Sequence, residues 1–121
     1  MKKLLLTILI LLAAVSNAQA QTQIAGASPS GLYMSSTGGV SWTPMNTGLG
    51  TYRVQAIASK GTDLYVGTEN NLYKSTNNGG SWQVSSTNIP AFTSISDVLV
   101  IPWNGRIFAV SLGSGVYGSF D

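Results

Sequence analysis

The sequence contains no cysteine and no histidine among its 121 residues. Serine–histidine and cysteine–histidine catalytic pairs are therefore impossible. A zinc site of the usual histidine and cysteine type is also excluded. No disulfide can stabilise the fold, and no lipid can be attached to a cysteine behind an export signal. The fold must therefore depend on apolar burial and on sheet pairing.

Charge is scarce as well, because only 8% of the residues are charged. Calcium sites need clustered oxygen ligands, and the acidic residues here stand singly. Glycoside hydrolysis generally needs a facing pair of carboxylates, and Asp63 and Asp97 are the best two available. Each has a simpler interpretation, since Asp63 lies in a predicted turn and Asp97 lies near the start of an apolar strand. We therefore expect no catalytic residue, no cofactor and no metal ion in this chain.

The first twenty residues have the pattern of a secretory signal peptide. Lys2 and Lys3 precede a run from Leu4 to Val15 that is apolar except for one threonine, and Ala18-Gln19-Ala20 is a small-x-small cleavage site. The alternative is a membrane anchor, but a spanning helix needs roughly 18 or more apolar residues. We expect cleavage before Gln21, export to the periplasm or the extracellular space, and no stable membrane insertion afterwards.

Removal of this segment changes the charge balance. Lys2 and Lys3 leave with it, so that four basic residues remain against four acidic ones and the net charge is zero. Nucleic-acid binding needs a basic face that neutralises phosphates. We therefore expect no nucleic-acid partner, because the remaining basic residues are few and scattered: Arg53, Lys60, Lys74 and Arg106.

The strongest positive signal is an internal repeat. Gly31–Trp42 and Asn71–Trp82 share Leu, Tyr, Ser, Gly, Ser and Trp at the same spacing, with an offset of 40 residues. A third copy with relaxed spacing begins at Val116 and reaches Asp121. Self-similarity at a fixed period of this length indicates a repeat architecture.

The segments between the turn residues all resemble strands. None has a helical period with caps, and short apolar runs alternate with Gly and Asn turns at about 8–12 residues. Pro44 suits an edge strand, and Pro102-Trp103-Asn104-Gly105 suits a hairpin turn. The expected strands are Gln23–Ser28, Leu32–Ser35, Ser41–Met45, Arg53–Ser59, Leu64–Thr68, Leu72–Ser75, Ser94–Ile101, Ile107–Ser111 and one that begins at Val116.

This pattern predicts an all-β protein. Four short antiparallel strands in about 40 residues make a β-propeller blade. Residues 21–121 would then form an incomplete propeller of about two and a half blades.

The conserved turn within the repeat resembles a known motif. Ser-x-Asp-x-Gly-x-x-Trp is the Asp-box of sialidase-type (BNR) repeats, which occur in sialidases, xyloglucan-degrading hydrolases, sortilin-like receptors and photosystem-assembly-factor-like propellers. The resemblance implies a propeller fold and leaves activity open, because enzymes and non-enzymes share the motif. The matching positions are Ser35, Thr37, Gly39 and Trp42, then Ser75, Asn77, Gly79 and Trp82, and finally Ser119 and Asp121.

We interpret the Asp-box residues as structural. Asp or Asn can accept hydrogen bonds from nearby backbone N–H groups, glycine permits positive φ, and tryptophan can cover the turn. Thr37 has only a hydroxyl where the motif has a carboxylate, so we expect the first turn to be looser. Sialidases also use three arginines and a tyrosine nucleophile. The chain has only Arg53 and Arg106, so the resemblance does not carry sialidase activity over.

Three hypotheses for function follow. A propeller typically has 4–8 blades, so the chain would be a piece of a longer secreted protein, or several chains would complete one ring. The first hypothesis is a non-catalytic interaction module that binds protein or glycan. The second is the N-terminal part of a secreted glycoside hydrolase, sialidase-like or xyloglucanase-like, whose catalytic residues lie outside this chain. The third is a fragment with no function alone, which would fold poorly.

One surface stands out for binding. Trp103 and Arg106 flank the Asn104-Gly105 turn, and an exposed indole beside a cation can stack on a sugar or anchor a partner. The alternative is that Trp103 packs on the next blade. We favour that packing, because tryptophan is highly buried on average.

Overall fold

The computed structural model describes residues 23–27, 31–49, 53–85 and 88–119. Within these ranges the chain forms ten strands and no helix, so the prediction of an all-β fold is confirmed. The predicted signal peptide over residues 1–20 lies outside the described residues, and so does Asp121 of the third Asp-box.

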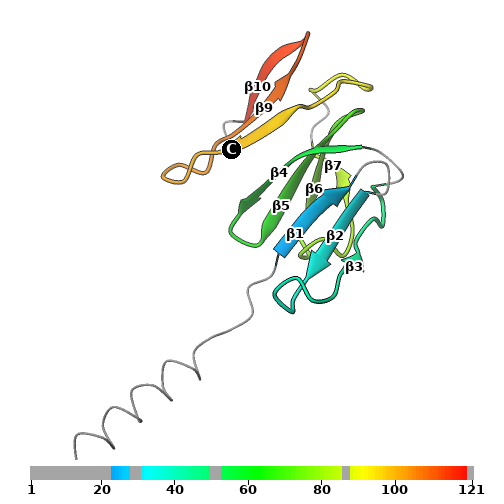
Figure 1. The fold of residues 1–121 in the computed structure, drawn as a ribbon. Coiled ribbons are helices and arrows are strands. Elements are labelled where there is room, and N and C mark those ends of the chain that lie inside the picture. The colour runs from blue at the N-terminus through cyan, green and yellow to red at the C-terminus, as the bar shows by residue number, and fades with distance from the viewer. Residues whose placement is uncertain (1–22, 28–30, 50–52, 86–87, 120–121) are drawn as a thin grey trace, which may run out of the picture.

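The described strands form three antiparallel sheets, which follow one another along the chain (Figure 1). Sheet 1 contains β1 (Gln23–Ala27), β2 (Gly31–Ser35) and β3 (Thr43–Pro44). Sheet 2 contains β4 (Val54–Lys60), β5 (Asp63–Thr68), β6 (Leu72–Ser75) and β7 (Gln83–Val84). Sheet 3 contains β8 (Asp97–Val100), β9 (Ile107–Ser111) and β10 (Gly115–Ser119). Sheet 2 lies between the other two.

The sheets repeat the same strand register. In sheet 1, Met34 pairs with Thr43, and forty residues later Lys74 pairs with Gln83. The strands β1, β2 and β3 therefore correspond to β5, β6 and β7. In sheet 3, Tyr117 pairs with Ala109 as Tyr73 pairs with Val66 in sheet 2. The strands β8, β9 and β10 thus correspond to β4, β5 and β6.

Burial follows the strand positions. Strand β4 alternates between half-buried and exposed residues, whereas the inner strand β5 is buried over almost its whole length. Pro44 lies in β3 at the edge of sheet 1, where a missing N–H does no harm. Strand β8 is shorter than the predicted Ser94–Ile101. The reason is that Ile95 donates its backbone N–H to the Thr68 carbonyl of sheet 2, at 2.8 Å.

Two apolar cores lie between neighbouring sheets. The core between sheets 1 and 2 consists of Leu32, Met45, Leu49, Leu64, Val66, Tyr73 and Trp82. The core between sheets 2 and 3 consists of Tyr65, Leu72, Ile89, Ile95, Val98, Ile107 and Ala109. Each sheet therefore stabilises the next one by face-to-face burial.

Candidate functional site

The second Asp-box turn, between β6 and β7, is held by side-chain hydrogen bonds. The buried Ser75 hydroxyl accepts the Gly79 N–H at 2.8 Å and donates to Asn77 Oδ1 at 2.8 Å. The same Asn77 oxygen accepts the Ser81 N–H at 2.9 Å. These bonds satisfy the backbone of a tight loop, so the serine and the asparagine act locally in this turn.

The first Asp-box turn uses a threonine for the same purpose. Thr37 Oγ1 accepts the Ser41 N–H at 2.9 Å, and Ser35 Oγ accepts the Gly39 N–H at 2.8 Å. Only the link between the Ser35 and Thr37 hydroxyls is longer, at 3.3 Å. The looser turn expected from the sequence is therefore limited to this one bond.

The two Asp-box tryptophans follow equivalent turns but lie in different surroundings. Trp82 is 3% exposed, and its indole N–H donates to the Met45 carbonyl of sheet 1 at 2.8 Å. Its backbone N–H donates to the Thr47 carbonyl at 2.9 Å. Trp42 is 43% exposed, and its indole N–H donates to Gly39 of its own turn at 3.1 Å. Trp82 therefore ties two sheets together, whereas Trp42 contacts its own turn.

Gly79 allows this contact between sheets 1 and 2. Its φ is 83°, as the Asp-box resemblance implies, and Gly39 matches it with a φ of 90°. A Cβ atom at Gly79 would also collide with the Met45 side chain of sheet 1. The glycine therefore serves both the turn and the close approach of the two sheets.

The two carboxylates considered for catalysis have local partners. Asp63 forms a partly exposed ion pair with Lys74, at 2.8 Å. The hydrogen bond to Asp63, with a smaller contribution from Tyr65, raises the pKa of Lys74 above its ordinary value. Asp97 accepts the N–H of the next residue, Val98, at 2.8 Å.

These carboxylates do not face each other across a site. The β8–β9 turn approaches sheet 2 through Gly105, where a Cβ atom would lie 2.8 Å from Lys60 Cε. Lys60 lies opposite Asp63 in the register of β4 and β5, so Asp63 lies at the same end of sheet 2 as this turn. Asp97 is the first residue of the four-residue strand β8, and the β8–β9 turn follows the last one. At about 3.3 Å per residue, Asp97 therefore lies roughly 10 Å from that turn.

Trp103 lies on the β8–β9 turn and is 83% exposed. The turn is defined by hydrogen bonds from Gly105 N–H to the Ile101 carbonyl, at 2.8 Å, and from Arg106 N–H to Asn104 Oδ1, at 3.0 Å. The hairpin turn predicted from Asn104-Gly105 is therefore present. The favoured packing of Trp103 on a neighbouring blade does not occur within the part of the chain that the structure describes, where the indole faces solvent.

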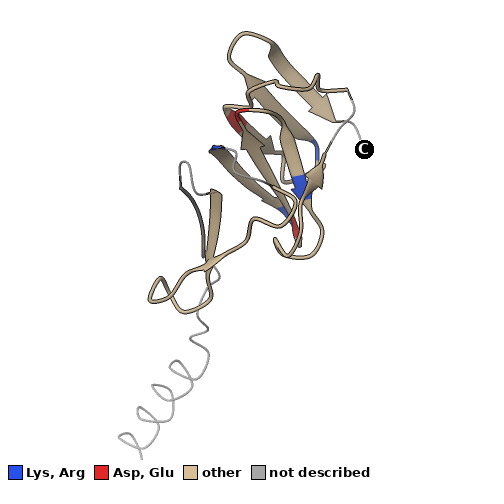
Figure 2. Ribbon diagram, turned by 90° about the vertical axis from the view of Figure 1, so that its right-hand side faces the viewer, with Lys and Arg blue, Asp and Glu red and all other residues tan. Residues whose placement is uncertain are grey.

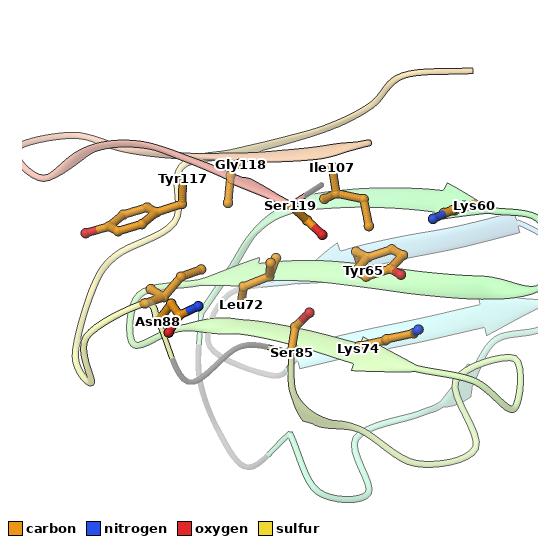
Figure 3. Close-up of a pocket in the computed structure, with 12 residues that line it drawn as sticks. Lys60, Tyr65, Leu72, Lys74, Ser85, Asn88, Ile107, Tyr117, Gly118 and Ser119 are labelled. Atoms are coloured by element: carbon orange, nitrogen blue, oxygen red, sulfur yellow. The ribbon is translucent and has the colours of Figure 1, made fainter. Parts of the chain in front are cut away.

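A feature that the sequence did not reveal is a cavity of about 610 Å³ between sheets 2 and 3 (Figure 3). Its floor carries Tyr65 and Leu72 of sheet 2, and its roof carries Ile107 and Tyr117 of sheet 3. No single motif marks it, because its lining comes from six segments of the chain: β4, β5, β6, the loop after β7, β9 and β10. Only a comparison of the two sheet interfaces, position by position, could have revealed it.

The charged residues of the described ranges are few and scattered, with both signs interspersed (Figure 2). Among these residues, no group of three or more acidic side chains is close enough to hold a metal ion. None of the described segments is a helix with the length and apolar character to cross a membrane.

Known structures resemble this arrangement. The structure of an ancestral GH74 enzyme matches with a TM-score of 0.71 and 26% identity, over 85% of this chain and 16% of that one. The structure of YCF48 bound to D1 peptide matches with a TM-score of 0.58 and 16% identity, over 83% of this chain and 41% of that one. Both are β-propellers. This chain is a partial β-propeller.

The three sheets are thus consecutive blades, and the predicted fold class is confirmed. The chain spans less than half the length of either known structure. No protein-family model matches the sequence, and no curated protein matches it.

Proposed function

We propose that this chain belongs to a secreted Asp-box propeller that binds a protein or glycan and performs no chemistry itself. The exposed indole of Trp103 carries the proposal. Large aromatic side chains on a rigid support provide much of the binding energy of protein interfaces, because they bury a large area with little loss of conformational freedom.

The surroundings of Trp103 suit this role. The β8–β9 turn is tied at both ends, since Ile101 and Arg106 also exchange a backbone hydrogen bond at 2.8 Å. Arg106 follows in the same turn, and Lys60 of sheet 2 lies beside Gly105. An indole with cations close by favours a partner that offers carboxylates or sugar hydroxyls next to an apolar face.

Two further observations support the proposal. YCF48 is a propeller whose structure was determined with a bound D1 peptide, so a fold of this kind accommodates a peptide partner. The signal-peptide pattern of residues 1–20 supports a location in the periplasm or outside the cell. The motif resemblance supports the Asp-box family, and the extent of the two matches supports a longer parent protein.

The proposal is tested by selecting a peptide-display library and a glycan array against the chain and against Trp103→Ala. We expect ligands whose affinity falls at least about tenfold in the variant, the loss typical of an aromatic anchor. Trp42→Ala, which alters another exposed tryptophan, is the matched control and should retain binding. Ligands that bind Trp103→Ala as well as the original chain would contradict the proposal.

A second candidate is a piece of a GH74-like glycoside hydrolase. It is favoured by the 26% identity and the TM-score of 0.71 with the ancestral GH74 enzyme. Because Asp63 and Asp97 lie apart, this candidate places the catalytic carboxylates in blades outside the present chain. Release of reducing sugar from xyloglucan by the parent protein, and none by this chain, would favour it over the binding module.

A further inference from the structure

The cavity between sheets 2 and 3 has a counterpart that is filled. Between sheets 1 and 2, Trp82 packs among six residues: Leu32, Met45, Leu49, Leu64, Val66 and Tyr73. The residues at the corresponding positions of the next repeat all line the cavity: Leu72, Ser85, Ile89, Ile107, Ala109 and Tyr117. The cavity therefore occupies, between sheets 2 and 3, the place that Trp82 occupies between sheets 1 and 2.

Backbone pairing supports this correspondence independently of the cavity. The Met45 N–H donates to the Leu32 carbonyl at 3.0 Å, and the Ser85 N–H donates to the Leu72 carbonyl at 2.8 Å. The Ser85 carbonyl thus stands where the Met45 carbonyl accepts the Trp82 indole N–H.

The cavity lies next to the open edge of sheet 3, which is strand β10. In sheet 2, Trp82 leads directly into β7, which pairs with Tyr73 and Lys74 of β6. In sheet 3, β10 is the terminal strand of the described sheet, and Tyr117 and Gly118 hold the corresponding positions. Gly118 also lines the cavity. If a further strand paired with β10 as β7 pairs with β6, the residue directly before that strand would lie in the cavity, as Trp82 lies directly before β7.

We propose that this cavity binds the indole of a tryptophan that leads into a short strand paired with β10. The occupant is an Asp-box segment of the proposed longer parent protein, with the sequence pattern of this chain's own Ser75–Val84, added as the fourth strand of the third blade. Ser119 pairs with Ile107 as Ser75 pairs with Leu64, so it begins the third Asp-box in the right register. Trp82 is the seventh residue after Ser75, so a tryptophan at the same spacing from Ser119 would reach the cavity.

The lining fits an indole chemically. Leu72, Ile89 and Ile107 provide apolar walls, and a peptide carbonyl stands at the position that accepts the ring N–H in the filled interface. A buried indole needs such a hydrogen-bond acceptor. This inference rests on the proposed longer parent protein, and it is independent of binding at Trp103.

The test extends the chain beyond Asp121 with a copy of its own second Asp-box, Asn78–Val84. The matched control carries alanine in place of the tryptophan in the added segment. We expect the tryptophan extension to melt at least about 5 °C above the alanine extension, since 1 kcal/mol shifts Tm by about 4–8 °C in a domain of this size. The added indole should also be protected from acrylamide quenching.

A second measurement adds the free peptide of Asn78–Val84 sequence to the 121-residue chain and monitors backbone hydrogen exchange of Leu72 and Tyr117. Slower exchange with this peptide, and none with its alanine version, supports the inference even if an extended chain folds poorly. Equal melting of the two extensions together with no protection by the peptide would overturn it. A dimer of the chain that Trp42→Ala abolishes, with no gain from the extension, would assign the cavity to a second copy and also overturn it.

Discussion

At the scale of single residues, Trp42 and Trp82 show how neighbours decide the role of a motif. Both follow a turn held by a serine hydroxyl and a glycine with positive φ. Trp82 is buried because sheet 1 provides an apolar wall and the Met45 carbonyl. Trp42 remains partly exposed because its outer side meets no sheet within the described residues. The same Asp-box therefore yields one tryptophan that joins sheets and one that does not.

Replacing each tryptophan separately should reveal this difference. Trp82→Ala should lower the free energy of unfolding by about 3–5 kcal/mol, because it removes a buried aromatic ring and leaves the Met45 carbonyl without its donor. Trp42→Ala should cost about 1 kcal/mol or less, since much of the ring is already in water. Urea unfolding followed by circular dichroism measures both. Equal losses would show that Trp42 is also an inter-sheet contact.

The sequence predicted the residues of these turns well, because local hydrogen bonding and positive φ depend on neighbours within five positions. It did not predict the partner of Trp82. Every residue has a backbone carbonyl, so the amino-acid sequence does not distinguish Met45 as the acceptor. It also gave no sign that Trp103 would face solvent, because exposure depends on whether another sheet covers the β8–β9 turn.

At the scale of elements, β5 and the segment before β8 approach each other unusually closely. A Cβ atom at Gly67 would lie 2.7 Å from the side chain and 2.7 Å from the backbone oxygen of Ile95. Ile95 also donates its N–H to the Thr68 carbonyl. This glycine, near the end of the buried strand β5, therefore allows sheets 2 and 3 to share a backbone hydrogen bond.

Gly67→Ala should separate these two sheets. The added methyl group meets a backbone atom that cannot rotate away, so the unfolding free energy should fall by about 1–3 kcal/mol. The control is Gly118→Ala in β10, where the added carbon lies 3.1 Å from the edge of the Phe108 ring, which can turn aside. We expect it to change stability by about 0.5 kcal/mol or less. If Gly67→Ala is equally harmless, the close approach does not hold the sheets together.

Strand positions followed from the two-residue period and the Gly and Asn turns, and eight of the nine expected strands coincide with observed ones to within about two residues. β7 was expected only by analogy within the repeat. The error at Ser94–Ile101 has a physical cause. Ile95 is apolar and β-branched, as is common in strands, but its backbone N–H bonds to Thr68 of sheet 2 and does not extend β8.

At the scale of the whole molecule, the outer faces of sheets 1 and 3 resemble faces that are covered in sheet 2. Val116 in β10 occupies the position of Leu72 in β6, but Val116 is 64% exposed and Leu72 is 5% exposed. Leu99 in β8 is also exposed. Apolar residues that a neighbouring sheet covers in the middle of the molecule therefore face solvent at its end.

We expect the chain to associate through these faces. Different surfaces at the two ends favour head-to-tail contacts that need not close, and open sheet edges add to this tendency. Sedimentation velocity should show a mean mass that rises with concentration, and Val116→Thr should reduce the rise. Leu112→Thr is the control, because Leu112 is equally apolar but lies in the β9–β10 turn. A mass independent of concentration would contradict the expectation.

The hydrogen bond from Trp82 to Met45 joins residues 37 positions apart and runs back toward the earlier sheet. During synthesis, the interface between sheets 1 and 2 can therefore gain this bond only when Trp82 has been added. At about 5–20 residues per second, one repeat of 40 residues takes roughly 2–8 s. The chain would then assemble stepwise from its N-terminus, each new blade being fastened to one that already exists.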